Sequence, residues 1–203
     1  MEETLIFVDD GFFRLVKKHF EEKSKKKKRF LQTFRNICKT ENFSLKHLFI
    51  YSAPPFQSEN PSKKENKLRE DHDKLKKMLQ NKNWITFREG RCQRLRIDGE
   101  YKFFQKGVDI LLVIDLMRFQ KYFTNIKKII LVACDSDFVP AIKQLINEDI
   151  EVILYTYFER KRNSRFSRYN ELLDASSRWV KLKEEDFDDP SLIKNVKKEG
   201  SKL

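Results

Sequence analysis

The sequence is poor in the residues that build disulfide frameworks and histidine-based sites. It contains three cysteines and three histidines in 203 residues. Cys38, Cys92 and Cys134 lie far apart, so they form neither a disulfide framework nor a CxxC metal knuckle, and we expect reduced thiols. The histidines lack HxxxH spacing and Cys/His neighbours, which leaves a zinc hydrolase or a nucleophile–histidine triad without support.

Long apolar runs and a targeting sequence are also missing. The longest apolar candidate, VDILLVIDLM, is broken by Asp109 and Asp115, so no stretch reaches the roughly 18 residues that a membrane span needs. The N-terminus, MEETLIFVDD, is acidic and lacks the basic region and cleavage site of a secretory signal. We therefore expect a cytoplasmic protein that has no membrane partner.

Positive charge exceeds negative charge strongly. Lysine and arginine number 43 against 31 aspartates and glutamates, which gives a formal charge of +12. Hydrophobic residues make up 39% of the chain and include 18 phenylalanines, enough to form a core. The length suits one domain and is short for two. We expect a soluble globular domain over residues 1–183, followed by a loose charged tail over 184–203.

Apolar runs alternate with helical patterns along the chain. The runs TLIFVDD, HLFIYSAPPF, IILVA and IEVILYTY are typical of buried strands, and apolar residues between them recur at helical spacing. This alternation predicts βαβ units, parallel strands and right-handed crossovers, and therefore an α/β fold. The polar residues 57–83 are expected to form a surface insertion. Residues 84–107 are expected to contain a basic hairpin that turns at Asp98 and Gly99.

Basic residues gather in two segments. One follows the first helical pattern and is either a solvated helix face or an anion-binding patch. Its members are Lys25, Lys26, Lys27, Lys28 and Arg29. The other lies in the expected hairpin, and its arginines could follow a nucleic-acid strand electrostatically. Its members are Arg88, Arg91, Arg94 and Arg96. The neighbouring Tyr101, Phe103 and Phe104 could stack on bases, although we favour a role in the core.

Carboxylates gather where the expected strands end. Asp9 and Asp10 end the first strand, and Asp135 and Asp137 follow the run IILVA. Functional groups of open α/β sheets collect at the carboxyl ends of the strands. Converging carboxylates repel each other, and either raised pKa values or a bound cation relieves the repulsion. An oxygen-only ligand set favours Mg²⁺ or Mn²⁺, whereas capping of the next helix is the alternative role for Asp137.

Two further acids, Asp109 and Asp115, cannot bind the same ion. On a helix, six residues place them roughly 240° apart, and on a strand the separation is roughly 20 Å. We assign Asp109, which opens the segment, as a metal ligand. We expect Asp115 to be a buried carboxylate that accepts hydrogen bonds from loop N–H groups.

Five segments together resemble the NYN domain family of PIN-like nucleases, in its LabA-like branch. In family order they are LIFVDDGFF, LFIYSAPPF, QKGVDILLVIDLM, ILVACDSDFVPAIKQLINEDIEVILYTY and ELLDASSRWVKL, from Leu5 to about Leu182. The signatures KGVDxxLxxD and GDSDFxP are specific when they occur together. The resemblance implies a PIN-like Rossmannoid three-layer fold with a central, mainly parallel sheet. It also implies divalent-metal-dependent cleavage of RNA, in single-stranded form.

The resemblance implies roles for individual residues. The catalytic metal ligands for Mg²⁺ or Mn²⁺ would be Asp9, Asp109, Asp135 and Asp137. Supporting positions would be Asp10, Asp115 and Ser136. Lys106 is placed either to hold a phosphate oxygen beside the ion or to lie solvated at the start of a helix. Two positions depart from the family pattern. Cys134 stands where a glycine is usual, and Phe12 stands where many members have asparagine, but neither change removes a ligand.

Two other functions compete with a nuclease. A non-catalytic RNA-binding or scaffold protein on the same fold would also be rich in lysine, but the intact set of five aspartates favours catalysis. A phosphatase of the haloacid dehalogenase kind needs Asp-x-Asp at the first strand, whereas here Asp9 is followed by Asp10 and Gly11. The sequence leaves the RNA target and the oligomeric state open, a homodimer included.

Overall fold

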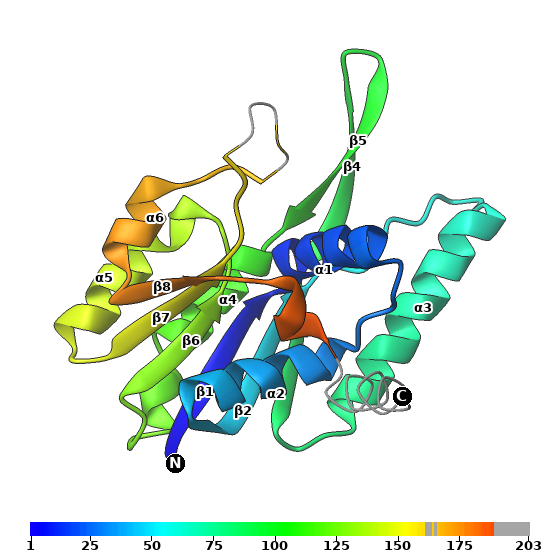
Figure 1. Cartoon of the computed structure of the whole chain (residues 1–203). Helices are drawn as coiled ribbons and strands as arrows, with labels where there is room; N and C mark the ends of the chain where they lie inside the picture. The colour runs from blue at the N-terminus through cyan, green and yellow to red at the C-terminus, as the bar shows by residue number, and fades with distance from the viewer. Residues whose placement is uncertain (161–163, 165, 189–203) are drawn as a thin grey trace, which may run out of the picture.

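A parallel six-stranded sheet forms the centre of the computed structural model, which describes residues 1–160, 164 and 166–188. Its strands are β1 (Glu2–Asp9), β2 (Phe43–Ser52), β3 (Ile85–Glu89), β6 (Lys128–Val132), β7 (Glu151–Thr156) and β8 (Arg178–Lys181). Their order across the sheet is β3-β2-β1-β6-β7-β8, and every adjacent pair is parallel (Figure 1). The predicted α/β architecture with parallel strands is confirmed.

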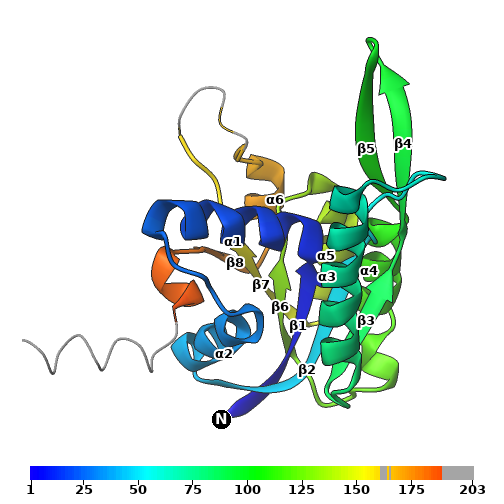
Figure 2. The ribbon, with the colours of Figure 1, turned by 90° about the vertical axis from the view of Figure 1, so that its right-hand side faces the viewer.

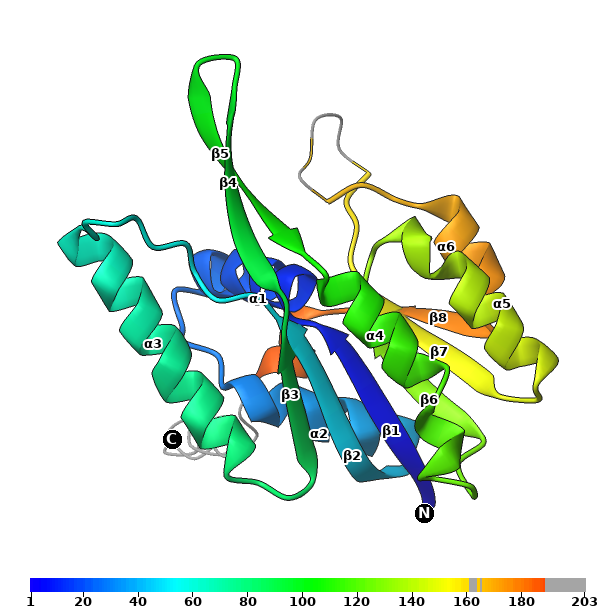
Figure 3. The same ribbon diagram turned by 180° about the vertical axis from the view of Figure 1, so that it is seen from behind.

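Helices cover both faces of the sheet. One face carries α1 (Asp10–Ser24), α2 (Phe30–Glu41) and α3 (Lys63–Gln80). The other carries α4 (Val108–Leu116), α5 (Val139–Asn147) and α6 (Asn170–Ala175), as Figure 3 shows from behind. Short 3₁₀ turns are η1 (Phe119–Lys121), η2 (Ser136–Phe138) and η3 (Glu184–Phe187). None of the helices in the described part of the chain is long and apolar enough to cross a membrane.

The strands are apolar throughout because each face of the sheet has its own core. Leu5 and Phe7 of β1 pack into the cluster under α4, whereas Ile6 and Val8 pack into the cluster under α1. All four side chains are fully buried. Parallel strands that are covered on both sides read as continuous apolar runs, which is the pattern from which β1 was predicted.

A basic hairpin stands apart from the sheet. It consists of β4 (Arg91–Ile97) and β5 (Glu100–Lys106), which pair with each other as a separate two-stranded sheet and extend beyond the main sheet (Figure 2). At its turn, Asp98 and Gly99 have φ values of 54° and 82°, as a two-residue turn of type I′ requires. The predicted hairpin and turn are therefore confirmed, but the segment before Gly90 forms strand β3 of the main sheet instead.

The root of the hairpin depends on Gly90. A Cβ atom at this position would lie 2.3 Å from the carbonyl oxygen of Lys106 and 2.9 Å from Cγ2 of Val108. The chain leaving β3 thus passes directly against the junction between β5 and α4. The positions of the hairpin and of the first turn of α4 are consequently linked.

Residues 57–83 are not a surface insertion, as the sequence led us to expect. They contain α3, which is the crossover helix between β2 and the parallel edge strand β3. Its helical start is fixed by a capping box between Ser62 and Glu65. Buried His72 and Leu79 anchor it to the domain.

The expected tail begins later than residue 184. Phe187 of η3 is fully buried, and its ring lies 5.5 Å from the ring of Phe13 and 5.3 Å from that of Phe20, measured between centroids. Residues 184–188 therefore belong to the domain. Residues 189–203, the rest of the expected tail, lie outside the described residues.

Candidate active site

The strand order creates a switch point between β1 and β6. The chain leaves β1 toward β2 and β3 on one side, and β6 leads to β7 and β8 on the other. Ligands of doubly wound sheets bind outside the carboxyl ends of the strands at such a point. Asp9 is the last residue of β1, Asp135 follows β6, and Asp109 lies in the first turn of α4. Three separate segments thus bring carboxylates to one edge of the sheet.

Asp9 is held in place by the helix that it caps. Its Oδ1 atom accepts hydrogen bonds from the backbone N–H groups of Gly11, at 2.9 Å, and Phe12, at 3.3 Å. Burial nevertheless raises the pKa of Asp9 from 3.8 to about 7, and the negative charges of Asp109 and Asp10 contribute to the rise. Burial thus favours the protonated form of Asp9 in the absence of a cation.

Asp109, Asp135 and Asp137 lie close enough to affect one another. Burial raises the pKa of Asp109, and the charges of Asp135 and Asp137 raise it further. Burial also raises the pKa of the Cys134 thiol to about 12, with contributions from Asp9 and Asp135. The negative charges of the four carboxylates are thus concentrated in one small region.

Asp137 does not cap the next helix, which was the alternative explanation for it, because Phe138 is the N-cap of α5 and no side chain caps that helix. Oδ1 of Asp135 accepts a hydrogen bond from the backbone N–H of Asp137 at 3.0 Å. Asp137 itself lies inside η2 and is exposed, next to Ser136. Capping therefore does not explain why an acid is present at position 137.

The donor set fits a hard divalent cation. Within the described residues, no three His, Cys, Asp or Glu side chains already surround one point in a way that could hold an ion. Mg²⁺, however, usually binds through one or two carboxylates and fills its other positions with water and substrate phosphate. Burial, with a smaller contribution from neighbouring carboxylates, raises the pKa values of Asp9 and Asp109, and a bound cation would favour the ionised form of both.

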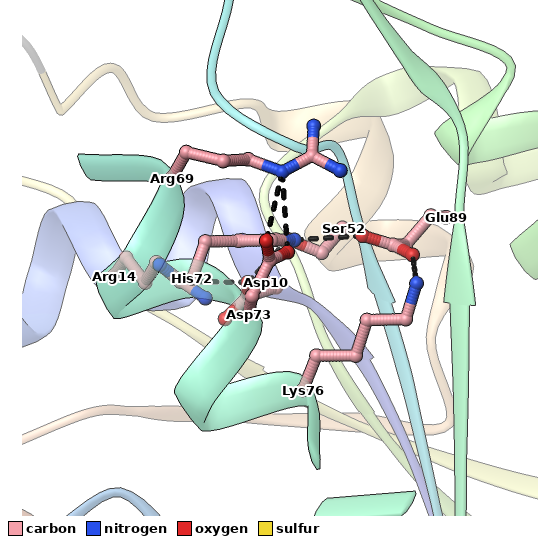
Figure 4. Close-up of polar contacts among 8 residues, drawn as sticks. All are labelled: Asp10, Arg14, Ser52, Arg69, His72, Asp73, Lys76 and Glu89. Carbon is pink, nitrogen blue, oxygen red and sulfur yellow. Dashed lines mark hydrogen bonds and ion pairs between the residues drawn. The ribbon is translucent and has the colours of Figure 1, made fainter. Parts of the chain in front are cut away.

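Asp10 takes part in a buried polar contact (Figure 4). Its side chain is fully buried, and Oδ2 accepts a hydrogen bond from the Ser52 hydroxyl at 2.6 Å. The same oxygen lies 2.7 Å from Nε of Arg14. These contacts tie the end of β2 to the start of α1, so Asp10 supports the position of Asp9.

A second polar group in Figure 4 fastens the crossover helix to the edge of the sheet. Nε2 of His72 lies 2.7 Å from Oε1 of Glu89, and Lys76 forms an ion pair with the same carboxylate. Both partners lower the pKa of Glu89, although burial opposes them. These contacts hold β3, from which the hairpin emerges.

Asp115 is partly buried, but the prediction that loop N–H groups bond to its carboxylate was wrong. The Tyr51 hydroxyl donates a hydrogen bond to Oδ2 of Asp115 at 2.8 Å, and Nη1 of Arg88 donates to Oδ1 at 2.5 Å. Side chains of β2 and β3, and not loop N–H groups, therefore bind this carboxylate. Arg88 is correspondingly engaged in an ion pair within the fold, and 38% of its side chain remains exposed.

The first basic segment is exposed except for one residue. Lys25, Lys26, Lys27 and Arg29 are exposed, whereas Lys28 is buried, with 6% of its surface accessible. The Lys28 ammonium group forms an ion pair with Asp188 and lies 3.7 Å from Oε1 of Glu184. The prediction that Lys28 binds nucleic acid was therefore wrong, because this side chain joins the α1–α2 connection to the C-terminal segment.

The hairpin presents most of the other predicted nucleic-acid-binding residues to solvent. Arg91, Arg94, Arg96 and Lys106 are all exposed. The aromatic residues beside them are exposed too, with accessible fractions of 58% for Tyr101, 57% for Phe103 and 38% for Phe104. Our preference for a core role of these three rings was wrong.

Sequence reasoning did not select Gln105 or Tyr51, both of which adjoin the acids. A Cβ atom at Gly11 would lie 3.2 Å from Oδ1 of Asp9 and 3.2 Å from Nε2 of Gln105, so the root of β5 reaches the carboxylate cluster. The available signal was the position of Gln105 directly before Lys106 and Gly107. Tyr51, bonded to Asp115, gave no comparable signal within its strand.

Comparisons with known proteins agree with this architecture. Residues 20–174 match the NYN domain. The crystal structure of a protein of unknown function from Vibrio parahaemolyticus is similar, with a TM-score of 0.52 and 18% sequence identity, over 92% of this chain and 95% of that chain. This likeness shows the fold, which is consistent with a PIN-like fold. No curated protein matches the sequence.

Proposed function

The chain belongs to the NYN domain family of PIN-like nucleases, and from that premise we propose that it is a divalent-metal-dependent ribonuclease that hydrolyses phosphodiester bonds of single-stranded RNA. We assign it to the LabA-like branch on the motifs KGVD and DSDF. The cytoplasm is the proposed location, because the unpaired thiols Cys38, Cys92 and Cys134 suit a reducing compartment.

The observation that supports this function is the carboxylate cluster at the switch point. Asp9, Asp109 and Asp135, with Asp137 beside them, would hold Mg²⁺ or Mn²⁺. When bound, such an ion polarises a phosphoryl oxygen and lowers the pKa of a coordinated water. An acid with a purely structural role is expected to form an ion pair with a basic side chain of the protein, as Asp10 does with Arg14 and Asp115 with Arg88.

The protein's own contribution is to position these groups and the RNA. Hydrogen bonds from backbone N–H groups fix one oxygen each of Asp9 and Asp135, which leaves the other oxygen of each available. Lys106 is exposed one residue before Gly107, the αL residue at the N-cap of α4, and there it would contact a phosphate oxygen beside Asp109. The exposed lysines and hairpin arginines would attract the phosphate backbone.

An assay of RNA cleavage tests the proposal directly. Single-stranded RNA should be cut when Mn²⁺ or Mg²⁺ is added, and EDTA should stop the reaction. Asp109→Asn should lose most of the rate and still bind RNA, because the basic surface is unchanged. The matched control is Asp149→Asn, since Asp149 is an exposed acid in the turn between α5 and β7.

Two results would contradict the proposal. RNA binding without any metal-dependent cleavage would favour the non-catalytic RNA-binding or scaffold function. Cleavage that continues in EDTA and in Asp109→Asn would show that the carboxylate cluster does not carry out the reaction.

A further inference from the structure

One face of the hairpin carries alternating cations and aromatic rings. The cross-strand pairs on this face are Arg94 with Phe103 and Arg96 with Tyr101. Residues directly opposite each other in an antiparallel pair project from the same side of the ribbon. The hairpin extends beyond the carboxyl ends of the sheet in every view, so this face is not covered by the central layers (Figures 1 and 2).

Arg94 fixes the rings in place. Its guanidinium carbon lies 4.4 Å from the centroid of the Tyr101 ring and 4.5 Å from that of Phe56, in the loop after β2. The rings of Phe56 and Phe103 are 5.3 Å apart. We call these four residues the aromatic platform. Cation–π and ring–ring contacts of this kind orient the side chains before any partner arrives.

The platform is oriented but still available for binding. More than half of the surface of Tyr101 and of Phe103 is accessible, with values of 58% and 57%. An aromatic ring that served the core would be covered. These rings instead receive support from Arg94 and Phe56 on one side and expose the remainder to solvent.

Charge identifies the partner as a polyanion. Residues 91–106 contain five basic side chains, Arg91, Arg94, Arg96, Lys102 and Lys106. They contain two acidic ones, Asp98 and Glu100, so the hairpin carries a net charge of +3. Positive charge combined with exposed rings is the composition of surfaces that bind single-stranded nucleic acid, where phosphates contact the cations and bases stack on the rings.

The platform leads to the carboxylate cluster. Gln105, at the root of β5, and Asp9 both lie next to Gly11. Tyr101 lies four residues before Gln105 on the same strand, toward the tip of the hairpin, which is ~14 Å from Gln105 at the rise of an antiparallel strand. One extended RNA segment could therefore occupy the platform while its next phosphates reach the acids.

We propose that the aromatic platform stacks on bases of single-stranded RNA and directs the strand toward Asp9, an inference that rests on the proposed function. Bases of a duplex are already stacked on one another and cannot pack against the rings, so the platform selects single strands. Stacking uses the π face that every base has, and the selection is consequently independent of base sequence.

Binding measured in EDTA tests the platform separately from cleavage. The probes are an oligouridine and a blunt RNA duplex of matched length, both labelled with fluorescein. Fluorescence anisotropy measures how tightly the protein binds each probe. Tyr101→Ala and Phe103→Ala should each weaken binding of the single strand about fivefold, the low end of the range for stacking of one base. Neither change should affect the duplex. The slope of log affinity against log salt should stay constant, because no charge is removed.

Three further variants serve as controls. Tyr101→Phe keeps the ring and should bind as the wild type does. Tyr122→Ala removes an aromatic ring that is 72% exposed but lies outside the hairpin, and it should have no effect. Arg96→Gln removes one charge from the face of the hairpin that carries Tyr101 and should reduce the salt slope by about 0.7.

The possible results separate this inference from the proposed function. Unchanged binding of the single strand by both alanine variants, or equal losses on single strand and duplex, would overturn the platform. If the ring variants weaken binding but no condition produces cleavage, the platform is supported and the nuclease proposal fails. If cleavage is observed but the ring variants bind normally, only the platform fails.

Discussion

Replacing Asp9 by asparagine removes one negative charge from the carboxylate cluster and retains the helix cap. Asparagine caps a helix as well as aspartate does, so the N–H groups of Gly11 and Phe12 keep an acceptor. The side chain keeps its size. A difference in stability between the two proteins therefore reports mainly the free-energy cost of ionising Asp9 in the folded state.

The sign of this cost follows from the pKa of Asp9, which is 3.8 ordinarily and about 7 in the folded protein. Between these pH values the folded protein binds more protons than the unfolded chain, so the free energy of unfolding decreases as pH rises. A difference of about three pKa units, at 1.36 kcal/mol each, gives at most about 4 kcal/mol. The loss begins above the unfolded pKa and is complete above the folded one.

We therefore expect Asp9→Asn to be more stable than the wild type by up to about 4 kcal/mol near pH 8, and the difference should vanish near pH 4. Urea unfolding of both proteins in EDTA across this range measures it. Carboxylates with lowered pKa values, such as Glu21, Glu41 and Glu89, make the free energy of unfolding increase with pH. Their contribution is the same in both proteins, so it cancels in the comparison.

A stability difference that stays constant with pH would refute the reasoning, because it would mean that Asp9 has an ordinary pKa in the folded protein. The same samples also test the metal site. Mn²⁺ at about 100 times its dissociation constant should stabilise the wild type by about 2.7 kcal/mol, and it should stabilise Asp9→Asn much less. Asp149→Asn should respond to Mn²⁺ as the wild type does.

Two further substitutions test contacts that hold the site in place. Lys28→Gln should lower the free energy of unfolding by about 1–3 kcal/mol, because its two carboxylate partners lose a buried cation. The control Lys26→Gln, at an exposed position, should change the free energy of unfolding by less than about 0.5 kcal/mol. Equal values for the two variants in urea unfolding would contradict the ion pair. Gly90→Ala should destabilise the protein by about 1–3 kcal/mol and weaken Mn²⁺ binding in calorimetry, because the new methyl group must displace the backbone at Lys106. Unaltered stability and Mn²⁺ affinity would show that the hairpin root can move freely.

The sheet could be predicted because its signals are local. Four of the six strands are apolar runs that any buried parallel strand would show, and the turn at Asp98 and Gly99 uses residues that tolerate positive φ. The crossover helix α3 was missed for a physical reason. A helix over an edge strand needs few apolar contacts, so only His72 and Leu79 are buried and the rest resembles a surface insertion.

The side-chain partners could not be predicted because they are distant in sequence. Asp115 bonds to Tyr51, 64 residues earlier, and Lys28 pairs with Asp188, 160 residues later. A run of four lysines carries no local signal that marks which one faces inward. The rings at 101 and 103 were misjudged in the same way, because an amphipathic strand pattern does not show whether its apolar face meets a core or solvent.

The ion pairs around the site explain how mutually repelling acids stay together. Two carboxylates beside the cluster have cationic partners, Asp10 with Arg14 and Asp115 with Arg88. Asp10 also joins α1 to Ser52 of β2, and Asp115 joins α4 to Tyr51 of β2 and to Arg88 of β3. These contacts hold the elements around the cluster together, while burial and, to a smaller extent, the charges of Asp109 and Asp10 raise the pKa of Asp9 to about 7. A divalent cation bound from solution would compensate the negative charge of the carboxylate cluster. The positive hairpin lies outside this negative centre, so RNA phosphate would be attracted to the platform first and would approach the acids only when a divalent ion has neutralised them.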